Sequence, residues 1–457
     1  MAIRKRLLAA VAVAAPLALL LSACAPGAVS TQPNKQPTSV SKNIASEGDV
    51  TLKMLDTFQG GDSTWVNAVI KQFEAKYPNV KISRTTQNFD QVMSTLNLRL
   101  ADPNGPDIAT VNNGWQSEGT LAQAGLILNL DKYASLYGWK SEIPATMQRE
   151  LEFTPDGKQM GSGSLYAVPT ARSSLIGLYY DKGILDSLGL PVPQTLADFE
   201  ADCAKIKAAG KVPIVYGSED KGPNTAILLA VQDLYGTAQN IGDFVYSKNG
   251  SSGKIADTGI VQAAQTVKKW ADAGWLTPNY AGIQYADAVN AFQSGKGAFR
   301  FEYTGTFSFT PAQQQSFGYV QLPQVADPST VVGTGSPSAN LAISAKSKHP
   351  DAAAAFLDFI AGKEAAQLGV DQGDLPLLHS GLSVPSNNPE FATEVAGQNA
   401  LDKDNGYVPY FDWSTPTMLD TLGTQLQLLL AGRATPDQLA QAAQQDYDKF
   451  QTQQKNG

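Results

Sequence analysis

The chain has 457 residues, 43% of them hydrophobic and 17% charged, so it is long enough to form two or three domains with buried cores. Its 34 basic and 42 acidic residues leave a net charge of -8, which argues against a nucleic-acid partner because no basic surface is available to neutralise phosphates. Its two histidines have no cysteine or carboxylate at ligand spacing, which argues against a metal site.

The N-terminus has the layout of a secretory signal. Three basic residues at 4–6 precede an apolar stretch from 7 to 21, which is too short for a membrane-spanning helix. The stretch ends in a tetrad that resembles the lipobox of bacterial lipoproteins: Leu21, Ser22, Ala23 and Cys24. The resemblance implies that residues 1–23 are a signal peptide and that an acylated Cys24 anchors the protein to the extracytoplasmic face of the cell membrane. The alternative is a plain secretory signal with a cleavage site nearby.

Residues 24–47 are expected to form the lipidated cysteine and a flexible tether. The segment is rich in Pro, Ser, Thr, Asn and Gln and has almost no bulky apolar residue, so it cannot bury enough surface to fold. The other cysteine, Cys203, lies in a helical pattern and has no partner once Cys24 is acylated. We therefore expect a buried free thiol and no disulfide.

The folded body begins with alternating strand and helix patterns. An apolar run at 50–55 predicts a strand, and Trp65, Val69 and Phe73 recur every four residues, which predicts an amphipathic helix that ends before Pro78. Strands at 80–82 and 107–110, with a helix over 92–100 between them, continue the order. Repeated strand–helix–strand order predicts a mainly parallel sheet covered by helices.

The alternation continues to the C-terminus and predicts an α/β fold throughout. Further strands are expected at 165–169, 175–180, 212–216, 297–301 and 341–344. Further helices are expected at 195–210, 224–235, 260–273, 285–293 and 350–361. A last helix should begin after Thr435, because Pro436 and Gln438 complete a strong start signal there.

No catalytic motif stands out. The sequence has no G-x-S-x-G elbow, and His349 and His379 lie in ordinary loop contexts. Gly217 and Gly222 have the spacing of a phosphate-binding loop, but Pro223 occupies the position of its lysine. We therefore expect no enzymatic activity, no catalytic residue, no metal and no cofactor. A carboxylate pair that meets only in space leaves no pattern in a sequence, so a secreted glycosidase stays open as an alternative.

Six segments of the body occur in an order that points to a known family. They are FEAKYPNVKI at 73–82, GPDIATVNNGW at 105–115, LYAVP at 165–169, GLYYDK at 177–182, AFQSGKGAF at 291–299 and LAIS at 341–344. Together they resemble the solute-binding proteins of ABC importers, in particular the oligosaccharide-binding branch that includes maltose-binding protein. The resemblance covers essentially all of 50–450.

The resemblance implies a two-lobed, periplasmic-binding-protein-like α/β fold, in which each lobe is a mainly parallel sheet flanked by helices and a hinge joins the lobes. By analogy, lobe one is expected at 48–170 plus 322–362, and lobe two at 171–321 plus 363–457. A sugar, in particular an oligosaccharide, would bind in the cleft between the lobes, and the closed form would deliver it to the permease subunits of an ABC transporter. The protein is expected to be monomeric.

The resemblance also points to the loops at strand ends that face the cleft. The residues expected to stack on sugar rings, with the acids beside them, are Trp115, Glu302, Tyr303, Phe307, Asp412 and Trp413. The loop from Glu302 departs from the Asn-Gly-x-Trp loop of the family, because Thr304 replaces the asparagine and Phe307 the tryptophan. Hydrogen bonds to hydroxyl groups are expected from Asp56, Gln59, Gln87, Asp90, Asn113, Arg172, Asp220 and Asn340.

The solute itself stays open at this point. An excess of aromatic residues over cations near the cleft favours a sugar, whereas a polyol or a peptide is the alternative ligand for the same fold. The glycosidase alternative requires two carboxylates at catalytic separation and measurable turnover.

Overall fold

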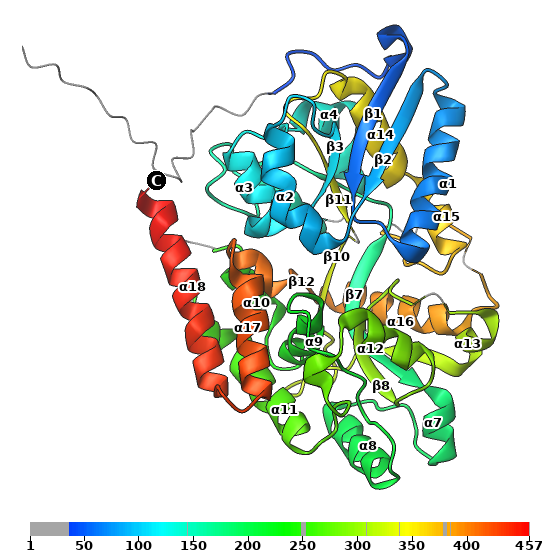
Figure 1. Ribbon diagram of the computed structural model, residues 1–457, viewed down its shortest axis with the longest axis vertical. Coiled ribbons are helices and arrows are strands. Elements are labelled where there is room, and N and C mark those ends of the chain that lie inside the picture. Colours follow the sequence, from blue (N-terminus) through cyan, green and yellow to red (C-terminus); the bar gives the residue numbers. More distant parts are fainter. Residues whose placement is uncertain are drawn as a thin grey trace, which may run out of the picture.

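The computed structural model describes residues 36–456, apart from 144, 248–252, 308, 338, 378–381 and 384. Two α/β lobes lie one above the other and are joined by several chain crossovers (Figure 1). The predicted signal peptide, the predicted lipidation site Cys24 and the loop residue His379 lie outside the described residues. The two-lobed α/β architecture expected from the sequence is confirmed.

The first lobe is built on a five-stranded sheet with the order β2-β1-β3-β11-β6. Its strands are β1 (Val50–Asp56), β2 (Val80–Thr86), β3 (Ile108–Val111), β6 (Val168–Pro169) and β11 (Asn340–Ile343). The first three run parallel, as predicted, whereas β11 is antiparallel to both of its neighbours. The carboxyl ends of β1 and β3 therefore meet at the same edge of the sheet, which faces the second lobe (Figure 1).

Two helices separated by most of the chain form the core of the first lobe. In α1 (Gly60–Lys76), Trp65, Val69 and Phe73 are all fully buried, so the four-residue spacing seen in the sequence marks the inward face. The Phe73 ring lies 5.1 Å from that of Phe356 in α14 (Pro350–Ala361), whose proline opens the helix as predicted. The core thus joins residues near 70 to residues near 355.

Shorter elements complete the first lobe. They are η1 (Ile44–Glu47), α2 (Phe89–Ala101), η2 (Gly114–Gln116), α3 (Glu118–Gln123), α4 (Asp131–Tyr137), α5 (Trp139–Glu142), α6 (Ala145–Gln148), η3 (Arg149–Leu151), β4 (Glu152–Phe153), β5 (Ser164–Leu165) and α15 (Lys363–Val370). Most of them are less than two turns long, which is too short to produce a clear hydrophobic period in the sequence.

The second sheet differs from the expected parallel arrangement. Its strands are β7 (Ser173–Asp181), β8 (Phe299–Tyr303), β9 (Phe317–Val320), β10 (Gly333–Pro337) and β12 (Tyr407–Val408). The central strand β7 is antiparallel to β8, β9 and β10, and only β10 and β12 pair in parallel. The predicted strand at 212–216 contributes isolated bridges through Ile214 instead of a full ladder.

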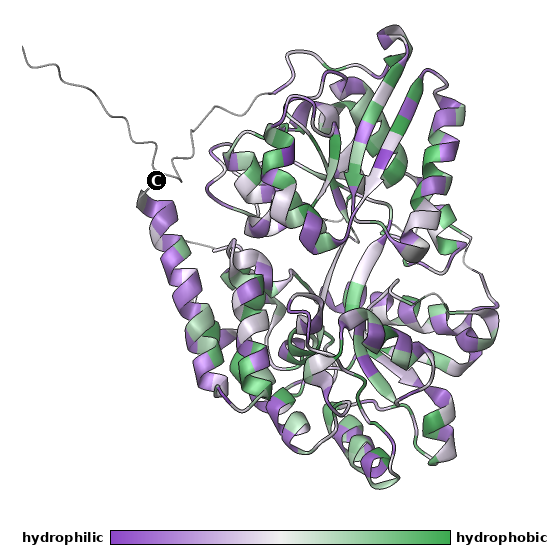
Figure 2. Ribbon diagram, in the orientation of Figure 1, coloured by the Kyte–Doolittle hydropathy of each residue, from purple (hydrophilic) through white to green (hydrophobic). Residues whose placement is uncertain are grey.

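Helices surround this second sheet. They are α7 (Lys182–Ser187), α8 (Leu196–Ala208), η4 (Pro223–Thr225), α9 (Ala226–Asp233), α10 (Ala238–Val245), η6 (Ile255–Thr258), α11 (Ile260–Asp272), η7 (Tyr280–Gly282), α12 (Tyr285–Gln293), α13 (Pro311–Ser316), α16 (Pro389–Asp404), η8 (Phe411–Ser414), α17 (Met418–Leu430) and α18 (Pro436–Asn456). The predicted start of α18 is confirmed, because Thr435 and Gln438 exchange hydrogen bonds of 2.8 and 3.2 Å. Figure 2 shows that α18 is mainly hydrophilic along its length.

The chain crosses between the lobes at three places, and two of them fall later than expected. β10 pairs with β7, so residues 333–337 belong to the second sheet and the crossover lies between β10 and β11 rather than at 322. α15 packs on the first lobe, where Ala365 accepts a hydrogen bond of 2.9 Å from the Trp65 indole. The predicted return to lobe two at 363 therefore comes too early, because the chain stays on the first lobe through α15.

The last part of the predicted tether is ordered on the first lobe. Ile44 is buried, and Glu47 lies 2.9 Å from the ring nitrogen Nδ1 of His349. The Lys132 ammonium donates to the carbonyl of Pro37 at 2.7 Å. The prediction of a flexible tether is thus wrong for these residues, because one buried isoleucine and a few polar contacts hold the segment in place. Within the described residues, no helix is both long and apolar enough to cross a membrane.

Candidate ligand-binding site

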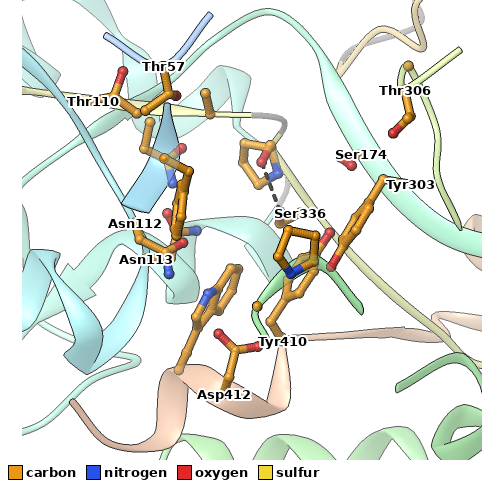
Figure 3. A pocket seen from close by; sticks show the side chains of 18 of the residues that line it. Thr57, Thr110, Asn112, Asn113, Ser174, Tyr303, Thr306, Ser336, Tyr410 and Asp412 are labelled. Atoms are coloured by element: carbon orange, nitrogen blue, oxygen red, sulfur yellow. Dashed lines mark hydrogen bonds between the residues drawn. The ribbon is translucent and has the colours of Figure 1, made fainter. Parts of the chain in front are cut away.

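A cavity of about 350 Å³ lies between the two lobes, and this volume falls within the range of small-molecule sites. Its first-lobe wall comes from the loops after β1 and β3, where Thr57, Asn112 and Asn113 are placed. Tyr303 at the end of β8 and Asp412 in η8 contribute from the second lobe (Figure 3). Open α/β sheets commonly bind ligands outside the carboxyl ends of their strands, as here.

The second-lobe wall is aromatic. The rings of Tyr303 and Tyr410 are nearly parallel, with centroids 6.1 Å apart and an interplanar angle of 14°. The centroids of the Tyr410 and Trp413 rings are 4.9 Å apart. Tyr285, whose hydroxyl donates to Glu302 at 2.7 Å, also lines the cavity. Such flat faces suit the C–H side of a pyranose ring or another small apolar surface.

The first-lobe wall at the ends of β3 and β11 is polar and uncharged. Three of its residues each have a buried side-chain atom without a hydrogen-bond partner among the described residues: Thr110 Oγ1, Asn113 Nδ2 and Asn340 Oδ1. Thr110 and Asn113 lie together on one side of Figure 3, opposite Tyr303. Because a buried polar group without a partner is costly, these atoms are available to exchange hydrogen bonds with a ligand.

An ion triad joins the crossovers at one end of the cavity. The buried guanidinium of Arg172, beside the first crossover, donates through Nη2 to Asp62 at 2.6 Å and to Asp374 at 2.9 Å. Asp62 belongs to α1 of the first lobe, and Asp374 lies on the third crossover. Burial raises the pKa of Asp374 to about 6, although Arg172 opposes the rise. The triad therefore holds the first and third crossovers against helix α1 of the first lobe.

A single carboxyl group stands apart on the aromatic side. Asp412 is only 4% exposed, and no described side chain pairs with its carboxylate. Burial raises the pKa of Asp412 to about 7. Its carboxylate borders the cavity below Tyr410 in Figure 3, so a ligand can reach it.

Six of the fourteen residues predicted as ligand contacts come together at this cavity: Asn113, Arg172, Tyr303, Asn340, Asp412 and Trp413. They come from five separate parts of the chain, and the resemblance to a family with a cleft is what grouped them. The other eight do not line the cavity.

Four of these eight lie at strand or helix ends but away from the cavity. Asp56 is fully buried and forms two hydrogen bonds of 2.7 and 2.8 Å with the Arg84 guanidinium. Gln87 accepts from Arg99 at 2.9 Å. Gln59 is exposed in front of α1, and Asp90 is exposed in the first turn of α2. The carboxylate and amide groups that looked available in the sequence are thus either occupied by arginine or turned to solvent.

The remaining four support the walls from behind. Trp115 packs between the rings of Phe153 and Phe450, with centroids 5.2 and 4.9 Å away. Phe307 packs on Tyr179 and Phe292 in a separate aromatic cluster. The other two are acids that hold wall elements: Asp220 accepts from the Tyr285 backbone at 2.6 Å, and Glu302 pairs with Arg300 at 2.6 Å.

Several wall residues were not predicted. They are Thr57, Phe89, Thr110, Asn112, Ser174, Tyr285, Thr306, Ser336 and Tyr410. Tyr410 stands in the same four-residue run as Asp412 and Trp413, so its neighbours were a sufficient signal. Ser336 gave no signal, because a short strand of small residues such as β10 has no hydrophobic alternation.

Two α/β lobes joined by three crossovers around an open cavity define a solute-binding receptor. The bacterial extracellular solute-binding protein family matches residues 56–367, and the chain belongs to this family. The family works outside the cytoplasm and consists of binding proteins rather than enzymes.

Named relatives and solved structures agree with this assignment. The multiple sugar-binding protein of Streptococcus mutans is 25% identical over 376 residues, which cover 81% of this chain and 82% of that protein. A chitin oligosaccharide binding protein shares the fold with a TM-score of 0.74 at 20% identity, over 88% of this chain and 99% of its own. The GacH receptor of Streptomyces glaucescens, solved with acarbose, has a TM-score of 0.69 at 19% identity over the same shares.

Proposed function

We propose that the protein captures a sugar in the cavity between its lobes and delivers it to the permease of an ABC importer. The observation that carries the proposal is the pairing of an aromatic wall with an uncharged polar wall, since sugar rings present C–H faces to the first and hydroxyl groups to the second. The sugar-binding names among its relatives support the same ligand class. The proposed contacts are Asn113, Arg172, Tyr303, Asn340, Asp412 and Trp413.

The proposed mechanism is binding without chemistry. A ligand that touches both walls favours the closed arrangement by its differential affinity, and closure creates the surface that the permease recognises. Within the described residues, no group of three histidine, cysteine, aspartate or glutamate side chains could hold a metal ion. We further propose that Cys24 carries the lipid anchor, that the residues before the ordered segment at 36–47 act as the tether, and that the receptor is a monomer.

The direct test is a thermal-shift screen of the detergent-solubilised full chain against mono-, di- and oligosaccharides, followed by calorimetry on the hits. A ligand that binds only the native state raises the melting temperature, by an amount that grows with its concentration over Kd. Product analysis after long incubation should recover the glycan intact. A shift with polyols or peptides alone would refute the sugar assignment, and cleaved glycan would favour the glycosidase alternative.

The anchor has its own test. Cell fractionation should place the native chain in the membrane fraction and a Cys24→Ser variant in the medium or periplasm. A Cys203→Ser variant is the matched control, because Cys203 is a buried free thiol that no lipid can reach.

A further inference from the structure

The Asp412 carboxylate is buried at the cavity wall without a compensating charge. Its side chain lies in η8, 4% exposed, and forms no hydrogen bond or ion pair with any described side chain. Taking a carboxylate out of water without a charged partner is costly, and the rise of its pKa to about 7 reflects that cost, although a hydrogen bond from its own backbone N–H opposes the rise. The group therefore gains more than any other in the cavity from a partner that a ligand brings.

No cation of the described walls is free to serve as that partner. Arg172 is the one basic residue among the described residues that line the cavity, and the two carboxylates that its Nη2 contacts, Asp62 and Asp374, compensate its charge. Its Nε and Nη1 atoms are buried without a hydrogen-bond partner, and no ion pair joins them to Asp412. Arg300, behind the wall, pairs with Glu302 at 2.6 Å. The triad of one arginine and two aspartates leaves an excess of negative charge even before Asp412 is counted.

The aromatic rings next to Asp412 add to this preference. Trp413 follows Asp412 directly in the chain, Tyr410 lies two residues before it, and Tyr303 stacks on Tyr410. The face of an aromatic ring carries partial negative charge and attracts cations within about 6 Å. A carboxylate beside three such rings is the chemistry that holds a protonated amine.

We propose that the sugar taken by this cavity carries a protonated amine, which pairs with the Asp412 carboxylate against the rings of Tyr303, Tyr410 and Trp413. Neutral hydroxyl groups can donate hydrogen bonds to the carboxylate, but they leave its charge uncompensated, whereas an ammonium group supplies both donors and charge. The inference rests on the proposed sugar-binding function and narrows its ligand class to basic saccharides.

The test compares sugars that differ only at one substituent. Glucosamine, glucose and N-acetylglucosamine carry an amine, a hydroxyl and a neutral acetamide at the same carbon, and galactosamine and galactose give a second pair. Chitosan, cellulose and chitin oligosaccharides share one backbone and carry the amine, the hydroxyl and the acetamide, respectively, so they repeat the comparison for longer ligands. Calorimetry at pH 7 on the full chain should give at least about tenfold tighter binding for the amine form of a pair, which equals about 1.4 kcal/mol.

Two variants test whether the preference for amines depends on Asp412. Asp412→Asn keeps the shape and a hydrogen-bonding side chain but removes the charge, so the affinity ratio between amine and hydroxyl forms should fall to about one. Asp272→Asn removes a charge from the exposed end of α11, where Asp272 pairs with Lys268, and should leave the ratio unchanged.

Each outcome decides the matter. A preference for amines that Asp412→Asn abolishes supports the inference. Equal affinities for amine and hydroxyl forms in the native protein overturn it while leaving the sugar-binding function intact, and so does a preference that survives in Asp412→Asn. Binding of neither form, with a shift from a non-sugar solute, overturns the proposed function and the inference together.

Discussion

The two lobes approach each other closely at a glycine, and adding one methyl group there should weaken ligand binding. Gly114, in η2 of the first lobe, has a φ of +69° and lies against the Trp413 backbone in η8 of the second. A Cβ atom at this position would stand 2.3 Å from Trp413 Cβ and 2.7 Å from its carbonyl oxygen. Ordinary contacts of this kind are 3.4 to 4 Å, so the lobes would have to part by about 1 Å.

The cost of Gly114→Ala has two parts. The left-handed backbone conformation costs an alanine about 1–2 kcal/mol in any arrangement of the lobes. The clash adds about 1–3 kcal/mol, typical of overpacking, and only while the lobes are in contact. Ligand affinity should therefore fall about fivefold to 150-fold, because only the second part separates the open from the closed form.

The assay is calorimetry with a sugar found in the thermal-shift screen, combined with small-angle scattering of the liganded protein. Gly432→Ala is the matched control, since Gly432 has the same φ of +69° and no atom lies within 4 Å of the position that its new methyl group would take. The control should lose stability but keep its affinity. Native-like affinity and native-like dimensions of liganded Gly114→Ala would refute the idea that this contact closes the cleft.

Three further outcomes follow from buried groups. A rise of the Asp412 pKa from 3.8 to about 7 means that the native state binds this proton more tightly than the unfolded chain, so stability falls by at most ~4 kcal/mol as pH rises from 4 to 8. For a body of roughly 400 residues, 1 kcal/mol of stability shifts the melting temperature by about 1 °C. The unliganded Asp412→Asn variant should therefore melt up to ~4 °C above the native protein at pH 8 and show no gain at pH 4. Melting temperatures of variant and native protein that depend on pH in the same way would contradict this. A double-mutant cycle of Trp115→Leu and Phe450→Leu should give a coupling of about 1 kcal/mol in ligand binding, and a coupling near zero would remove these rings from cleft closure. Asp56→Asn should cost roughly 3 kcal/mol in urea unfolding because it leaves Arg84 without its carboxylate, while an unchanged midpoint would show the pair to be dispensable.

Local sequence patterns predict the regular helices of this fold well. The four-residue spacing in α1 predicted a helix that ends before Pro78, and the capping pair predicted the start of α18; both agree with the structure within a few residues. The second sheet was less predictable, because β10 joins β7 across a distance of more than a hundred residues and local sequence carries no sign of strand direction. A parallel arrangement was a reasonable expectation from alternation alone, and the wrong one for this lobe.

The residues of the candidate site were also only partly predictable from the sequence. Asp56 and Asp412 both looked like cleft carboxylates, yet the Arg84 side chain pairs with the first and no described side chain pairs with the second. That difference depends on a partner in another strand, which no spacing in the sequence reveals. Trp115 followed the expected loop after β3, but its ring turns to Phe450 near the C-terminus. Strand-end position therefore selects residues near a cleft without deciding which of them face it.

The interleaved connectivity also sets an order in which the body can fold. β3 gains its neighbour β11 only when Asn340 pairs with Val111, after the entire segment that builds most of the second lobe has been made. Contacts between residues so far apart are slow to form, so the first lobe must remain incomplete while the second is synthesised. The N-terminal half of the chain therefore cannot close into a finished domain before residues 340–343 have been made.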